Sequence, residues 1–152
     1  MIVTAMLAWF EEPTDLLDAC VRSLGGFCDR IVAVDGAYDL TPGKARRSPP
    51  EQAEAIEKAA SAAGIEAEIF VPGRVWEGQV QKRDFMLRLA AERSDYVFAC
   101  DADYIVRCEV PAVRAELEES DADAFRLRFH TPIPAGFDVK RHATKGVDLN
   151  LA

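Results

Sequence analysis

The sequence predicts a Rossmann-like, three-layer α/β/α fold in which a mostly parallel sheet lies between two layers of helices. Short apolar runs of strand length alternate along the chain with longer segments of helical period. Glycine or proline stands at most of the junctions between them. Two of the apolar runs end on aspartate. This alternation is typical of parallel sheets, because each return to the same edge of the sheet needs a crossover connection.

The first part of the chain supplies two strands and one helix. Residues 2–9 form an apolar run and are the first predicted strand. Apolar residues at helical spacing predict a helix over residues 14–24, and the two glycines that follow are a usual helix end. Residues 30–35 form a second short apolar strand, which closes on Asp35.

The middle of the chain supplies a loop, a helix and a third strand. Residues 36–50 are rich in glycine, proline and serine and carry the basic residues Lys44, Arg46 and Arg47, so we predict a loop. The run Ser48-Pro49-Pro50-Glu51 has the layout of a capping box with proline at the first helical position. The predicted helix continues to about residue 63, and residues 65–71 form the third strand.

A third helix is predicted over residues 79–93, with five apolar residues turned inward: Val80, Phe85, Met86, Leu89 and Ala90. The strand after it ends on Asp101. A helix over residues 111–119 and an alternating strand over residues 125–129 extend the pattern. We expect one domain over residues 1–130 and an irregular tail over residues 131–152.

Two carboxylates one residue apart, Asp101 and Asp103, close the strand that begins at residue 96. Ligands of parallel α/β sheets bind outside the carboxyl ends of the strands. Hard divalent cations prefer oxygen ligands and often bridge to phosphates. The same tripeptide recurs at Asp121 and Asp123 between a helical and a strand-like segment, where it is interpreted as a solvated turn. The first triplet is therefore the predicted metal site.

Composition limits the classes of partner. The net charge of −8 argues against a nucleic-acid polymer or an anionic membrane surface as the binding partner. The apolar N-terminal run is too short to span a membrane and lacks the layout of a signal peptide, so we expect a cytoplasmic protein without a membrane span. The four cysteines fit no standard zinc or redox spacing, and we predict reduced core thiols.

Four short motifs together resemble the family-2-like glycosyltransferases, whose fold is the GT-A type, over about residues 2–129. In order along the chain they are Glu11-Glu12, Asp35 within Val34-Asp35-Gly36-Ala37-Tyr38, Gln81-Lys82-Arg83 after Gly78, and Asp101-Ala102-Asp103. The second and third motifs are similar to a variant among bacterial and phage-encoded members. The resemblance implies a metal-dependent glycosyltransferase that takes a nucleotide-diphospho-sugar donor, with an unknown acceptor and Mn²⁺ or Mg²⁺ as cofactor.

The resemblance also implies roles for single residues at a donor site. Asp101 and Asp103 hold the cation, and Asp101 also reaches the ribose or a metal-bound water. Lys82 or Arg83 lies near the pyrophosphate. The remaining donor-binding residues are Glu11, Asp35, which contacts the base or ribose, and Tyr38, which stacks on the base.

Five of these residues also have a purely structural interpretation. Asp35 could cap the loop before Gly36, and Glu11 could favour the start of the next helix through the helix dipole. Lys82 and Arg83 could be solvated residues on an exposed helix face, and Tyr38 could pack on its own domain. The two tryptophans, Trp9 and Trp76, are expected in the core or in a pocket wall.

The sequence does not identify the acceptor site of the predicted enzyme. Residues 104–152 show no clear motif for a catalytic base, and Asp138 and Asp148 are the candidates in this unpatterned stretch. A non-catalytic or truncated nucleotide-binding module of the same fold is therefore the alternative. A nucleotidyltransferase ranks last, because no glycine-rich phosphate loop follows the first strand.

Overall fold

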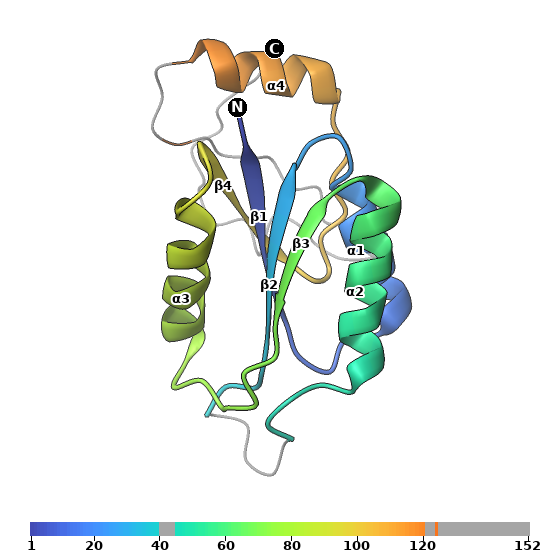
Figure 1. Cartoon of the computed structure of the whole chain (residues 1–152), viewed down its shortest axis with the longest axis vertical. Helices are drawn as coiled ribbons and strands as arrows, with labels where there is room; N and C mark the ends of the chain where they lie inside the picture. The colour runs from blue at the N-terminus through green and yellow to red at the C-terminus, as the bar shows by residue number, and fades with distance from the viewer. Residues whose placement is uncertain (40–44, 121–123, 125–152) are drawn as a thin grey trace, which may run out of the picture. The chain divides into compact units, whose positions relative to one another are not determined.

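Four parallel strands form one sheet in the computed structural model, which describes residues 1–39, 45–120 and 124 (Figure 1). The chain divides into a unit of Met1–Glu119, which contains the sheet and its helices, and a unit of Ser120–Ala152. The strands lie in the order β3-β2-β1-β4. Their bounds are β1 Val3–Trp9, β2 Arg30–Asp35, β3 Glu66–Phe70 and β4 Tyr96–Asp101. The predicted strand 125–129, boundary at 130 and tail 131–152 lie outside the described residues.

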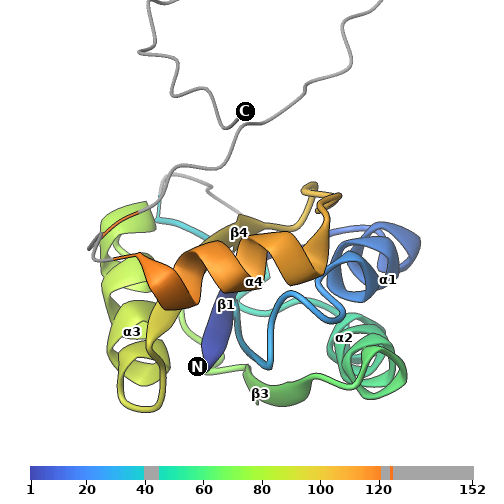
Figure 2. The ribbon, with the colours of Figure 1, turned by 90° about the horizontal axis from the view of Figure 1, so that it is seen from above.

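Helices cover both faces of the sheet, which confirms the Rossmann-like α/β prediction (Figure 2). Helices α1 (Thr14–Ser23) and α2 (Pro50–Ala63) pack against each other on one face, and α3 (Gln79–Ala91) covers the other. The chain steps from β1 to β2 to β3 in one direction and returns to β4 on the far side of β1. Because parallel crossovers are right-handed, this return places α3 opposite to α1 and α2.

Helix α4 (Val110–Glu119) is held at the amino-terminal ends of the strands (Figure 1). Arg114 of α4 donates hydrogen bonds to the backbone carbonyls of Met1 and Phe27 and to the carboxylate of Asp29. The Tyr96 hydroxyl at the start of β4 donates to the carbonyl of Leu117. These contacts keep α4 away from the carboxyl ends of the strands.

The core on the α3 face contains a cluster of six buried residues: Met6, Val32, Val34, Trp76, Met86 and Ala90. Its α3 members stand four residues apart, and the next residue in that row is Lys82, which is also buried. The predicted inward position of Val80 is wrong, because its side chain is 83% exposed. Val80 lies only two residues from Lys82, which places it on a different side of the helix.

The start of α2 also differs from the prediction. Pro50 occupies the first helical turn as expected, but Pro49 is the N-cap residue and no side chain caps the helix. The Ser48 hydroxyl instead donates to Asp35 at the end of β2. The predicted capping box does not form, because a tertiary hydrogen bond takes its serine.

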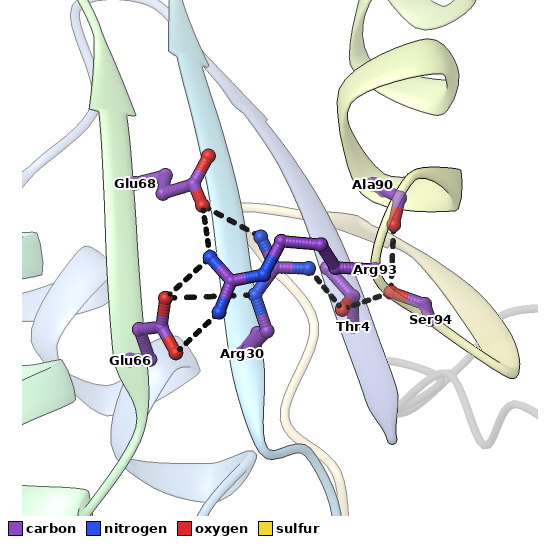
Figure 3. A network of polar contacts seen from close by, with 7 residues as sticks. All are labelled: Thr4, Arg30, Glu66, Glu68, Ala90, Arg93 and Ser94. Carbon is purple, nitrogen blue, oxygen red and sulfur yellow. Dashed lines mark hydrogen bonds and ion pairs between the residues drawn. The ribbon is translucent and has the colours of Figure 1, made fainter. Parts of the chain in front are cut away.

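A polar network joins three strands to the end of α3 on the face of the sheet that α3 covers (Figure 3). Arg30 of β2 is buried and donates to the Glu68 carboxylate at 2.6 Å and to the Thr4 hydroxyl at 3.4 Å. Arg93 donates to Glu66 at 2.9 Å and to Glu68 at 3.3 Å. The network holds the edge strand β3 to β2 by side-chain contacts in addition to the backbone ladder.

All four cysteines are free thiols. Cys20, Cys28 and Cys100 are buried, as predicted, whereas Cys108 is exposed. The Cys20 and Cys100 sulfur atoms lie 3.6 Å apart between α1 and β4. Within the described part of the chain, no helix is long and apolar enough to cross a membrane.

Candidate functional site at the carboxyl edge of the sheet

Three of the predicted motifs meet at one edge of the sheet. In the register of the ladder, Trp9 at the end of β1 pairs with Asp35 of β2, and Ala8 pairs with Asp101 of β4. Glu11 follows two residues after β1. Between β1 and β4 the strand order reverses, and in open parallel sheets ligands bind outside the carboxyl ends at such a reversal.

The Asp101-Ala102-Asp103 motif forms a turn directly after β4. The Tyr104 N–H donates to the Asp101 carbonyl at 3.0 Å, and the Ala102 side chain is buried beneath the turn. Asp103 is exposed, and the Asp101 side chain is 39% exposed. The turn therefore presents two carboxylates that a ligand from solvent can reach.

Arg83 of α3 forms an ion pair with Asp101. Its Nη2 atom donates to both carboxylate oxygens, at 2.9 Å to Oδ1 and 3.1 Å to Oδ2. The Arg83 side chain is 40% exposed, so the ion pair lies at the surface of the edge and not in the core. Two residues that sequence analysis assigned to the same site thus contact each other directly.

Lys82 is turned the other way, into the protein. Its ammonium donates to the backbone carbonyls of Trp9 at 2.9 Å and Gly36 at 3.0 Å, and the residue is only 1% exposed. Burial lowers the pKa of Lys82 to about 8, although the nearby Asp35 carboxylate acts in the opposite direction. Lys82 therefore ties together the ends of β1 and β2, and the interpretation of this residue as a solvated side chain on an exposed face is wrong.

Asp35 is buried and fully engaged by Ser48. The Ser48 backbone N–H donates to one Asp35 oxygen at 2.7 Å and the Ser48 hydroxyl to the other at 2.6 Å. The same hydroxyl accepts a hydrogen bond from the Glu11 N–H at 2.8 Å. Asp35 thereby fixes the segment after β1 and the segment before α2, and its carboxylate does not face solvent.

Tyr38 lies beside the loop that precedes α3. It forms an isolated bridge with Trp76, and the Asp39 N–H donates to the Trp76 carbonyl at 2.8 Å. The Tyr38 ring is half-buried, with the Lys82 ammonium 5.5 Å from its centroid, and desolvation raises its hydroxyl pKa. The aromatic ring is thus at the edge predicted for it.

Gly36 permits this arrangement. Its φ is +120°, which disfavours any residue with a side chain, and an added Cβ would meet the Trp76 Nε1 atom at 2.8 Å. The Trp76 indole donates from Nε1 to the Asp35 carbonyl at 2.9 Å. Trp76 is fully buried in the core cluster, as predicted, and its indole braces the end of β2.

A hollow of about 590 Å³ opens next to these groups. It is lined by Glu11, Gly73 and the segment before and at the start of α2, residues 45–50. Arg46 and Arg47 in that segment are exposed cations. Glu11 has a φ of +51°, an uncommon backbone conformation for a residue with a side chain, which marks the bend after β1. Both arginines lie in the segment that was predicted only as a loop, without a role in the site.

The carboxylates of Asp101 and Asp103 suit a cation that is also bound by a phosphate ligand. No group of three or more histidine, cysteine, aspartate or glutamate side chains gathers in the part of the chain that the structure describes. Asp101 and Asp103 supply two carboxylates, and Mg²⁺ is commonly bound by one or two carboxylates together with substrate phosphates and water. These two residues therefore fit a cation that arrives with a diphosphate better than one held by protein alone.

No protein-family model matches this chain, and no curated protein sequence matches it.

Proposed function

We propose that this chain is a metal-dependent glycosyltransferase that binds a nucleotide-diphospho-sugar donor at the carboxyl edge of its sheet. The observation that supports this most is the position of the Asp101-Ala102-Asp103 turn, at the end of β4 and beside the reversal of strand order. The turn offers two reachable carboxylates, and Arg83 stands next to it. A cation site and an arginine at one strand end suit a diphosphate.

The proposed roles follow from where the side chains lie. Asp103 and Asp101 would hold Mn²⁺ or Mg²⁺, which when bound supplies Lewis-acid stabilisation of the diphosphate leaving group. Arg83 presents a planar guanidinium that binds phosphate oxygens in a bidentate manner. Its position beside the turn supports a contact with the pyrophosphate.

The other predicted donor residues divide into two kinds. Glu11 and Tyr38 border the edge on the segments after β1 and β2, and we assign them to the nucleoside part of the donor. Asp35 and Lys82 are positioning residues in this proposal. Their polar groups are already used to hold the two segments in place.

The transfer activity is tested by the release of nucleoside diphosphate. UDP- and GDP-sugars are incubated with the protein and MnCl₂, and free UDP or GDP is measured with and without candidate acceptors. We expect metal-dependent release that falls at least about 100-fold in Asp103→Asn, the size of loss seen when one electrostatic stabiliser is removed. The exposed Glu116→Gln on α4, at the other end of the strands, is the matched control and should retain full activity.

A second function, donor binding without transfer, is favoured by the internal use of Asp35 and Lys82. Both charged groups are bonded within the protein. They keep the binding surface rigid but are not available to act on a substrate. The acceptor-side candidates Asp138 and Asp148 lie outside the described residues. Binding of UDP or GDP with no release from any donor sugar would support this second function and contradict the first.

A further inference from the structure

We propose that Arg83 locks the cation site in the nucleotide-free protein, and that the diphosphate of the ligand releases it. The inference rests on the proposed function, since it assigns a regulatory role to a residue of the same site. The Arg83 guanidinium and a divalent cation compete for the Asp101 carboxylate. Cation and nucleotide therefore bind cooperatively, and each binds weakly alone.

The contact geometry supports the competition. A single nitrogen, Arg83 Nη2, lies within 3.1 Å of both oxygens of Asp101, so it already engages both atoms with which this carboxylate could hold a cation. Both side chains are about 40% exposed, so the pair can open to solvent without disrupting the core. An accessible ion pair of this kind is weak enough to exchange partners.

The helix that carries Arg83 is fixed in place. The ion pair with Asp101 can therefore break only by movement of the Arg83 side chain. The preceding residue, Lys82, is buried and bonded to the carbonyls of Trp9 and Gly36. Met86, one turn further on, is buried in the core cluster. Release of Asp101 therefore requires rotation of the Arg83 side chain and not movement of α3.

The charges at the site explain why a diphosphate would draw Arg83 away from Asp101. Asp101 and Asp103 carry two negative charges, and Arg83 neutralises one of them while it repels an approaching dication. A diphosphate offers the guanidinium new bidentate acceptors and brings further oxygens to the cation. By linkage, the factor by which nucleotide raises cation affinity equals the factor by which cation raises nucleotide affinity.

The test uses Mn²⁺ alone, measured as free Mn²⁺ by electron paramagnetic resonance during titration of the full chain. We expect Arg83→Met to bind Mn²⁺ about tenfold more tightly than wild type, from loss of both the competitor and its charge. Arg83→Lys, which keeps the charge, should recover most of the wild-type weakness. Arg88→Met is the matched control, since Arg88 forms an exposed ion pair with Asp84 at 2.9 Å on the same helix.

A second variant localises the effect. Adding Asp101→Asn to Arg83→Met should abolish the gain in Mn²⁺ affinity, because the gain is assigned to the freed carboxylate. Should Arg83→Met fail to fold, Arg83→Gln replaces it in the same comparison.

The outcomes separate the lock from the proposed function. Equal Mn²⁺ affinity in folded Arg83→Met, Arg88→Met and wild type overturns the lock, whatever the nucleotide does. Tighter Mn²⁺ binding by Arg83→Met alone supports the lock, even if neither UDP nor GDP binds to any variant. In that last case the competition of Arg83 for Asp101 stands, whereas the proposed donor function and the release by diphosphate both fail.

Discussion

Ser48 gives both of its polar hydrogens to Asp35, one from its backbone N–H at 2.7 Å and one from its hydroxyl at 2.6 Å. Because the hydroxyl also accepts from the Glu11 N–H, one serine joins the end of β2 to the segment after β1 and to the segment before α2. The candidate site is built on this junction. Its rigidity is therefore a property that single substitutions can test.

Ser48→Ala should lower the free energy of unfolding by about 1–3 kcal/mol, because it removes the hydroxyl that donates to the buried Asp35 carboxylate and accepts from the Glu11 N–H. Urea unfolding followed by circular dichroism measures the change. Ser61→Ala, an exposed serine on α2, is the control and should differ from wild type by less than about 0.5 kcal/mol. Equal stability of the two variants would contradict the role given to Ser48.

Lys82 predicts a distinct dependence of stability on pH. Its pKa falls from 10.5 in the unfolded chain to about 8 in the folded protein through burial. Between these two values the unfolded state binds more protons, so the unfolding free energy rises with pH. Relative to Lys82→Met, which cannot titrate, the wild type should gain stability as the pH is raised from 8 to 10.5.

The measurement is urea unfolding of both proteins at several pH values, with Lys58→Met as the control. Lys58 is exposed on α2, so its removal should leave the pH profile of the wild type unchanged. A difference between wild type and Lys82→Met that stays flat from pH 7 to 10.5 would show that the Lys82 ammonium is not desolvated.

Glu68 is predicted to stabilise the fold through the buried guanidinium of Arg30. Glu68→Gln removes the charge that Arg30 meets at 2.6 Å, which leaves a buried cation with Thr4 at 3.4 Å and Glu66 at 3.8 Å. We expect a loss of about 1–3 kcal/mol in the free energy of unfolding. The exposed Glu57→Gln on α2 should cost less than about 0.5 kcal/mol, and a similar cost at both positions would argue against the network.

The thiols should divide into one reactive and three protected groups. Cys108 is exposed, whereas the other three cysteines are buried, and burial raises the pKa of Cys28. Titration of the native protein with an aromatic disulfide reagent should release about one equivalent quickly, and four only after unfolding. Cys108→Ser should remove the fast phase. Rapid release of two or more equivalents from the native protein would show that the face between α1 and β4 opens readily.

The order of strands and helices could be predicted from the sequence because its signals are local. The apolar runs that end at Asp35 and Asp101 and the glycine after α2 mark boundaries that depend on a few neighbouring residues. Once the order is known, the parallel sheet and its two helical layers follow from the handedness of crossovers. The placement of the acidic residues at one edge follows in turn.

The contacts of the site could not be predicted in the same way. The acceptors of the Lys82 ammonium lie 46 and 73 residues away in sequence, on backbone carbonyls that carry no residue-specific signal. The capping-box pattern at Ser48 was misleading because Asp35, 13 residues earlier, competes for the same hydroxyl. Val80 was misplaced because the sequence does not reveal that Lys82 is buried. The burial of Lys82 turns Val80, two residues earlier, toward solvent.

Calorimetric titration of UDP and GDP, with and without Mn²⁺, tests for a cation-dependent nucleotide site at Asp101 and Asp103. We expect binding of at least one of the two nucleotides that strengthens with Mn²⁺, is lost in Asp103→Asn and is retained in Glu116→Gln. No binding under any of these conditions, or equal binding by the two variants, would contradict it.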